Sequence, residues 1–173
     1  DVLDKDGNSV PAGEVGMIEV SGPNVFQGYW RMPEKTAEEV RPDGFFITGD
    51  LGTQDAQGRL SIVGRSKDLV ISGGYNVYPK EVEVALDDLP QINESAVIGL
   101  PHRDFGEAVV AVVVPSAGEV TLAEVDQALT DKLARFKQPK QVLNVSELPR
   151  NTMGKVQKNV LRDRYSDLFD GSR

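Results

Sequence analysis

The 173-residue sequence contains no cysteine and a single histidine, His102. Without cysteine there can be no disulfide, no thiolate nucleophile and no cysteine metal ligand, which fits a reducing compartment, so we expect a cytoplasmic protein. A histidine triad or a histidine metal cluster would depend on His102 alone. We interpret His102 as a loop residue after Pro101. The sequence therefore predicts no metal site.

Long apolar runs are also missing. No stretch approaches the roughly 20 apolar residues that span a bilayer, and the polar residues 1–9 do not form a signal peptide. A content of 39% apolar residues is still enough to bury a core in one or two domains. The formal net charge of −8 argues against nucleic acid and membranes as partners, because the overall field repels polyanions.

Basic residues are concentrated near the end of the sequence. Residues 132–164 contain nine basic and two acidic side chains, a local balance of +7, so the remainder carries −15. A basic segment on an acidic protein is either a solvated face or a surface for a small phosphorylated ligand. The charge pattern leaves both interpretations open.

The first third of the sequence predicts a small antiparallel sheet. Short alternating runs at residues 15–20, 45–48 and 59–63 are separated by turn residues. Residues 33–40 favour one or two helical turns with acidic residues near the start. Residues 1–7 predict a strand that enters a turn, so we expect the chain to begin inside a domain.

The pattern changes after Gly64 and predicts a compact α+β unit. Apolar runs of strand length alternate with segments of helical spacing. Thr121 and Glu124 have the spacing of a capping box, and Pro139 is expected to end the helix that follows. The expected strands cover residues 69–72, 95–100, 108–114 and 141–145, and the expected helices cover residues 80–86, 122–138 and 156–169. The chain is thus expected to divide into an incomplete β-rich part, residues 1–64, and an α+β domain, residues 65–173.

Lys155 directly follows a loop bracketed by Pro149 and Gly154. The phosphate-binding P-loop needs glycine at position 149 and a hydroxyl at position 156, where this chain has Pro149 and Val156, so that motif is excluded. By itself, Lys155 is more simply interpreted as a surface lysine that begins a helix, although a cation is mildly unfavourable there.

Two other glycine-rich segments could approach a ligand. In the run from Thr48 to Gly52, Asp50 is expected in an open glycine turn, where it could accept both hydroxyls of a ribose or serve in ordinary turn chemistry. The pair Gly73-Gly74 allows backbone conformations closed to other residues and close approach of a ligand. A hairpin turn would have the same sequence.

The order and spacing of these segments resemble one family over nearly the whole chain, the adenylate-forming acyl-CoA synthetases. The resemblance rests on the runs Gly13–Gly16, Gly28–Trp30, Pro33–Thr36, Thr48–Asp50, Gly64–Glu83 and Pro149–Lys155. Within the family, Phe105-Gly106-Glu107 and residues 149–158 are most similar to malonyl-CoA synthetases. The resemblance implies that residues 65–173 are the small mobile α+β carboxy-terminal domain of such an enzyme.

The resemblance implies an acid–thiol ligase that converts an acid, ATP and coenzyme A into acyl-CoA, AMP and pyrophosphate. The acid would be malonate or methylmalonate, and Mg²⁺ would accompany ATP. Lys155 would be the catalytic lysine that bridges the carboxylate and the α-phosphate. Asp50 would bind the ribose hydroxyls, assisted by Arg65. Lys67 would be the hinge about which the carboxy-terminal domain swings between the two half-reactions.

In the second orientation, the family's pantetheine tunnel would be lined by Ser72, Gly73, Gly74 and Tyr75. Lys137 and Lys140 are candidate contacts for the CoA phosphates. The family's phosphate loop and most of its acyl pocket would lie upstream of Asp1, so the chain alone is expected to be inactive. As an alternative function, Lys155 corresponds to a target of reversible acetylation in bacterial members, which would make a lysine acetyltransferase and a deacetylase the partners of a recognition module.

Overall fold

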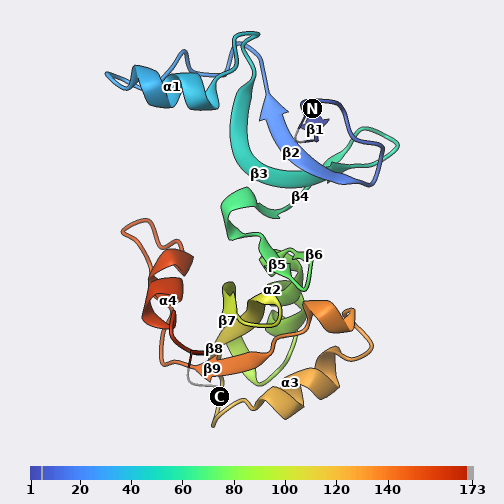
Figure 1. The fold of residues 1–173 in the computed structure, drawn as a ribbon, viewed down its shortest axis with the longest axis vertical. Coiled ribbons are helices and arrows are strands. Elements are labelled where there is room, and N and C mark those ends of the chain that lie inside the picture. The colour runs from blue at the N-terminus through green and yellow to red at the C-terminus, as the bar shows by residue number, and fades with distance from the viewer. Residues whose placement is uncertain (5, 171–173) are drawn as a thin grey trace. The chain divides into compact units, whose positions relative to one another are not determined.

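The computed structural model describes residues 1–4 and 6–170, and the chain divides into two compact units, Asp1–Lys67 and Asp68–Arg173 (Figure 1). The division follows a 3₁₀ turn, η1, that covers Ser66–Asp68. Arg65, which we had expected to open the second domain, is the last residue of a strand in the first unit.

The first unit is a four-stranded antiparallel sheet with the strand order β1-β2-β3-β4, as the alternating runs predicted. Its strands are β1 (Val2–Leu3), β2 (Val15–Val20), β3 (Phe46–Gln54) and β4 (Leu60–Arg65), and its helix is α1 (Pro33–Glu39). Pro33 begins α1, where the missing N–H of proline costs nothing, and Glu34 lies in the first turn near the positive helix end.

Strand β3 is longer than predicted and contains the segment Thr48–Gly52, so the expectation of an open turn around Asp50 was wrong. Asp50 remains paired with Arg65 of β4. Gly49 has a positive φ of 73°, and the register shifts between Leu51 and Gly52. Here the glycines form a bulge inside the strand instead of ending it.

The second unit is a five-stranded sheet in which β8 is central, with antiparallel neighbours β7 and β5 and the parallel neighbour β9. Its strands are β5 (Val70–Ser72), β6 (Tyr75–Val77), β7 (Ile92–His102), β8 (Gly106–Pro115) and β9 (Gln141–Asn144). Its helices are α2 (Pro79–Asp87), α3 (Leu122–Leu129) and α4 (Lys158–Arg164), with a 3₁₀ turn, η2, at Arg135–Lys137. The predicted α+β class is confirmed.

Both faces of β8 are covered, which explains its unbroken apolar run. Val109 and Ala111 belong to a buried cluster that includes residues of α2 and α3. The alternate residues Val110 and Val112 pack with Leu161 of α4 in a second cluster. Figure 1 shows α3 and α4 on different sides of the strands of this unit. A strand buried on both faces loses the apolar–polar alternation of a half-exposed strand.

Local signals in the sequence predicted parts of the helices correctly. Val82 and Leu86 of α2 are fully buried on the expected side of the helix. The capping box at α3 is present: the Thr121 hydroxyl accepts from the Glu124 N–H at 3.3 Å, and the Glu124 carboxylate accepts from the Thr121 N–H at 2.8 Å. The hydrogen bonds from the Thr121 hydroxyl and N–H lower the pKa of Glu124.

Two helices are shorter than predicted. Helix α3 ends at Leu129 instead of continuing to Pro139, and the Gln138 side chain donates to the carbonyls of Leu129 and Leu133 at 3.3 and 2.9 Å. These bonds satisfy the carbonyls of Leu129 and Leu133, which would accept from backbone N–H groups if the helix continued to residue 138. Helix α4 begins at Lys158, because Val156 is held in a bridge to Arg150, and it ends at Arg164. Within residues 1–4 and 6–170, no helix has the length and apolar character needed to cross a bilayer.

A buried ion pair joins α4 to α2. The ammonium of Lys158 lies 2.7 Å from Oε1 of Glu83, and the two side chains are 17% and 9% exposed. The same Glu83 oxygen accepts a hydrogen bond from the Val97 N–H of β7 at 2.8 Å. Glu83 thus links two helices and the sheet.

Replacing Lys158 should destabilise the second unit strongly. Lys158→Met leaves the Glu83 carboxylate buried without its counter-charge, and we expect a loss of about 3–5 kcal/mol in the free energy of unfolding. Adding Glu83→Gln should recover part of this loss, since a neutral amide oxygen can still accept from Val97. Urea unfolding of the unmodified chain, of Lys158→Met and of the double variant measures both effects. A loss no larger than that of an exposed pair, about 1 kcal/mol or less, would contradict the interpretation.

Candidate functional site

Lys155 lies at the end of a closed loop that precedes α4. The loop is pinned at its base by the bridge between Arg150 and Val156 and by the Gln157 N–H, which donates to the Pro149 carbonyl at 2.8 Å. Gly154 has a φ of 80°, a conformation that other residues adopt at a cost. The Lys155 side chain is exposed and makes no ion pair with the residues that the structure describes.

Asn151 makes hydrogen bonds across the inside of this loop. Its side-chain oxygen accepts from the N–H groups of Met153 and Lys155 at 3.0 and 2.9 Å, and its own N–H donates to the Lys155 carbonyl at 2.9 Å. Both backbone polar groups of Lys155 are therefore satisfied by Asn151. The backbone of Lys155 is fixed while its ammonium reaches into solvent.

Asp50 and Arg65, expected to act together at a ribose, lie side by side in the first unit. They are registered partners on β3 and β4, and Nε of Arg65 is 3.0 Å from Oδ1 of Asp50. The Asp50 side chain is 26% exposed and that of Arg65 51% exposed. The Thr48 hydroxyl accepts from the Asp50 backbone N–H at 3.1 Å. The backbone of Asp50 is thus held by Thr48 and its carboxylate by Arg65, and the carboxylate remains partly exposed.

The Gly73-Gly74 pair forms the turn between β5 and β6, which is the hairpin alternative left open by the sequence. Ser72 and Tyr75 are partners across it. Gly73 and Gly74 have φ values of 58° and 82°, and positive φ at both central residues is what a tight hairpin of matching twist requires. Ser72 is buried, whereas Tyr75 is 59% exposed and stacks on Phe136 of η2 with ring centroids 4.7 Å apart.

Phe105 of the β7–β8 turn and Glu107 of β8 form hydrogen bonds with this hairpin. The Gly73 N–H donates to the Phe105 carbonyl at 2.9 Å, and the Ile71 N–H donates to the Glu107 carboxylate at 2.8 Å. The sequence identified Phe105 and Glu107 only as family markers. Nothing in their spacing indicates which backbone groups they would contact, because the partners lie more than 30 residues away along the chain.

Lys155 and the glycine hairpin are attached to opposite ends of β7. The loop that carries Lys155 reaches β7 through the pairing of Arg150 with Glu94, near the start of the strand. The hairpin reaches the turn that follows His102, at the other end. A strand rises about 3.3 Å per residue, so the two attachment points are roughly 25 Å apart. In Figure 1 the loop that leads into α4 and the β5–β6 hairpin are likewise separate.

The basic segment is far less positive than its sequence balance of +7 indicated. Four of its nine cations make ion pairs with acidic residues of an earlier segment, residues 68–94. The pairs are Lys137–Glu81, Arg150–Glu94, Lys158–Glu83 and Arg162–Asp68. These four charges attach elements to one another, so the sequence balance overstates the field that a ligand meets.

Lys137 and Lys140 lie beside the glycine hairpin. Lys137 follows Phe136, which stacks on Tyr75, and its ammonium is 2.6 and 2.8 Å from the two Glu81 carboxylate oxygens. The ammonium of Lys140 lies 5.8 Å from the centre of the Phe105 ring. Of the two, only Lys137 makes an ion pair within the described part of the chain.

Lys67, the expected hinge, is exposed and is the last residue of the first unit. The next residue, Asp68, is held to the second unit by Arg162 of α4 at 3.1 Å. Free rotation of the backbone would therefore have to occur before Asp68.

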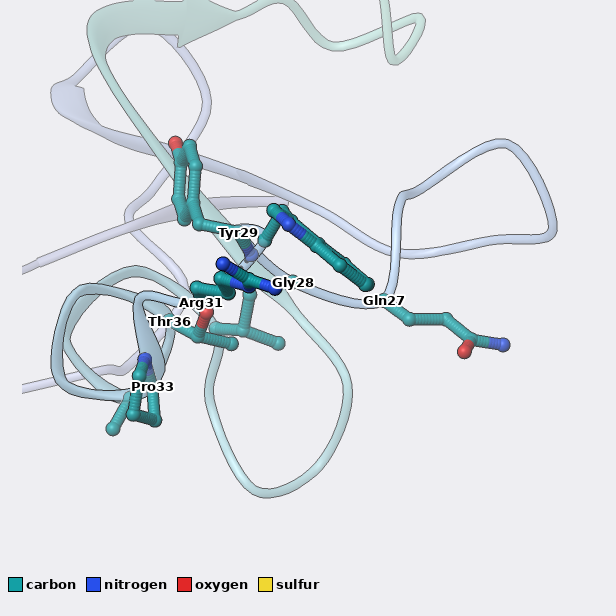
Figure 2. A pocket seen from close by; sticks show the side chains of 9 residues that line it. Gln27, Gly28, Tyr29, Arg31, Pro33 and Thr36 are labelled. Atoms are coloured by element: carbon teal, nitrogen blue, oxygen red, sulfur yellow. Dashed lines mark hydrogen bonds between the residues drawn. The ribbon is translucent and has the colours of Figure 1, made fainter.

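The first unit also has a surface depression of about 510 Å³ around Gln27–Val40. Arg31 and Thr36 are among its lining residues, and Figure 2 shows the Gln27 side chain extending away from them. Tyr29 donates its hydroxyl to Glu39, which raises the pKa of Tyr29. Trp30 is 84% exposed. Over residues 1–4 and 6–170, neither this depression nor any other place brings three or more Asp, Glu or His side chains together around a metal position.

Comparison with known proteins identifies the region that carries Lys155. The family described as AMP-binding enzyme C-terminal domain matches residues 81–155. The indoleacetate–CoA ligase of Aromatoleum aromaticum is 45% identical over 93% of this chain and 32% of its own length. A feruloyl-CoA synthase of an Amycolatopsis species is 46% identical over 92% of this chain and 32% of its own length. The chain thus spans about a third of the length of these relatives.

Solved structures agree with this assignment. ATP-bound MatB from Rhodopseudomonas palustris matches with a TM-score of 0.90 and 60% identity over 97% of this chain and 34% of that chain. Apo MatB from the same organism matches with a TM-score of 0.72 at the same identity and coverage. The chain therefore belongs to the adenylate-forming acyl-CoA synthetase superfamily, as a carboxy-terminal portion that resembles that of the malonyl-CoA synthetases.

Proposed function

We propose that this chain is the carboxy-terminal part of an ATP-dependent acyl-CoA synthetase that acts on malonate or methylmalonate. The observation that carries the proposal is Lys155: an exposed ammonium on a fixed backbone, in a region that matches the AMP-binding enzyme C-terminal domain. The preference for malonate is supported by the 60% identity to MatB and by the resemblance to malonyl-CoA synthetases.

Lys155 would act in the first half-reaction. A carboxylate oxygen of the acid attacks the α-phosphorus of ATP, the bond to the bridging oxygen of the β-phosphate breaks, and pyrophosphate leaves. Both reactants are anions. A compact ammonium held between them lowers their repulsion and stabilises the charge that builds up in the transition state.

Asp50 and Arg65 would bind the nucleotide. One oxygen of Asp50 faces Arg65, and the partly exposed carboxylate can accept hydrogen bonds from the ribose hydroxyls. Mg²⁺ would arrive with the phosphates of ATP. The role of Arg65 in this proposal is twofold, since it orients Asp50 and offers further donors to the ribose.

The glycine hairpin would act in the second half-reaction. The CoA thiol attacks the carbonyl carbon of the acyl-adenylate, the carbon–oxygen bond to AMP breaks, and the thioester forms. Ser72, Gly73, Gly74 and Tyr75 would line the path of pantetheine after rotation at Lys67.

The main test is Lys155→Ala in the complete enzyme. Malonate-dependent adenylation should fall by about 100- to 1,000-fold, because a preorganised charge at the transition state is lost. Thioester formation from supplied malonyl-AMP should be nearly unchanged. Single-turnover assays separate the two steps. Acetate serves as the comparison acid that tests the preference for malonate. Asp50→Ala should instead raise KM for ATP. The 173-residue chain alone should release no pyrophosphate. Equal losses in both half-reactions would refute the assignment.

Lys137 and Lys140 are proposed contacts for the CoA phosphates, because η2 packs on the hairpin through Phe136 and Tyr75. Lys140→Glu should raise KM for CoA and leave KM for ATP unchanged. Lys137→Glu should have a smaller effect on CoA, since Glu81 already neutralises Lys137. If neither variant changes KM for CoA, this part of the proposal fails.

A second function, recognition by a lysine acetyltransferase, is favoured by the exposure of Lys155 on a loop. Acetylation would remove the charge needed for adenylation. Incubation with a bacterial protein acetyltransferase and acetyl-CoA, followed by mass spectrometry, should modify Lys155 in preference to Lys158, whose ammonium is buried against Glu83. Modification spread evenly over the exposed lysines, or none at all, would count against this function.

A further inference from the structure

The side chain of Arg150 connects the Lys155 loop to the sheet. One nitrogen of its guanidinium, Nη1, donates to the Gly154 carbonyl at 2.6 Å. The other, Nη2, donates to the carboxylate of Glu94 on β7. Arg150 therefore reaches the residue immediately before Lys155 and a strand of the core at the same time.

Arg150 and Asn151 restrain different parts of the same loop. Asn151 satisfies the N–H and the carbonyl of Lys155, but it belongs to the loop and moves with it. Arg150 also belongs to the loop, yet its partner Glu94 does not. Among the hydrogen bonds of the Arg150 and Asn151 side chains, the one to Glu94 runs from the loop to β7, whereas the others stay within the loop. The planar guanidinium suits this task, because it presents several donors in fixed directions, whereas a lysine ammonium is a single point of charge.

The pairing of Arg150 with Glu94 differs from the ion pair between Lys158 of α4 and Glu83 of α2. Lys158 and Glu83 are largely buried, and their pairing secures α4 against the core. Arg150 and Glu94 are 45% and 38% exposed, so their pairing contributes little to the stability of the fold. We therefore expect the loss of this pair to affect the placement of the loop more than the stability of the fold.

We propose that Arg150 and Glu94 are positioning residues for Lys155, an inference that rests on the proposed role of Lys155 in adenylation. Neither side chain needs to touch substrate. They hold the Gly154 carbonyl at a fixed distance from β7. The backbone that carries Lys155 is therefore already positioned when the ammonium contacts the substrate. A displacement of about 1 Å in a reacting group can cost about 100-fold in rate.

The test uses the complete enzyme and the variants Arg150→Ala, Arg150→Lys and Glu94→Gln. Arg150→Ala should slow adenylation by about 10- to 100-fold, with KM for ATP and thioester formation from supplied acyl-AMP unchanged. Arg150→Lys should show a smaller loss, because lysine can reach only one of the two acceptors well. Arg103→Ala is the matched control, since Arg103 forms an exposed pair with Asp104 in the same unit.

Hydrogen exchange of the loop amides provides a readout that does not depend on activity. Arg150→Ala and Glu94→Gln should speed exchange over residues 151–156, and Arg103→Ala should not. The proposal is overturned if loop exchange is unchanged, or if both half-reactions fall together with the thermal midpoint. A normal adenylation rate in Lys155→Ala would refute the proposed function instead. A normal rate in Arg150→Ala, with Lys155→Ala slowed, would refute the positioning role alone.

Discussion

The antiparallel pairing of β7 with β8 is the constraint on which the second unit depends. The two strands run together from Glu94, opposite Val114, to His102, opposite Gly106. Because β8 is buried on both faces, this ladder can neither shift register nor bend without disrupting two apolar clusters at once. One end of the ladder receives the Lys155 loop, and the other end holds the glycine hairpin. The stiffness of the sheet thus fixes the spacing of the two segments.

This arrangement gives a physical reason for the domain movement that the proposed function requires. Segments roughly 25 Å apart on a rigid sheet cannot both act on one reacting centre without a movement of the domain as a whole. The ion pairs of the basic segment have a related role. Arg150, Lys158 and Arg162 attach the loop, α4 and the start of the unit to the core. Lys155 makes no ion pair among the described residues, and we propose that its ammonium contacts the acid and the α-phosphate.

Much of the fold could be predicted because its signals are local. The capping box at Thr121, the buried face of α2 and the valine-rich strands all depend on residues within one or two turns of each other. The strand around Asp50 could not be predicted, since glycine weakens strands and only the pairing with Arg65 reveals the bulge. The same limit applies to the site. Lys155 could be proposed from its loop together with the family resemblance, whereas Glu94 and Glu107 contact partners distant in sequence.

A crystal structure of the complete enzyme with a non-hydrolysable malonyl-adenylate analogue tests the central claim most directly. The account predicts that the loop from Arg150 to Val156 keeps its internal hydrogen bonds and its contact with Glu94. The Lys155 ammonium should lie within hydrogen-bonding distance, about 3 Å, of the acyl or phosphate oxygens. A rebuilt loop, or a Lys155 ammonium directed into solvent while the analogue occupies the site, would contradict it.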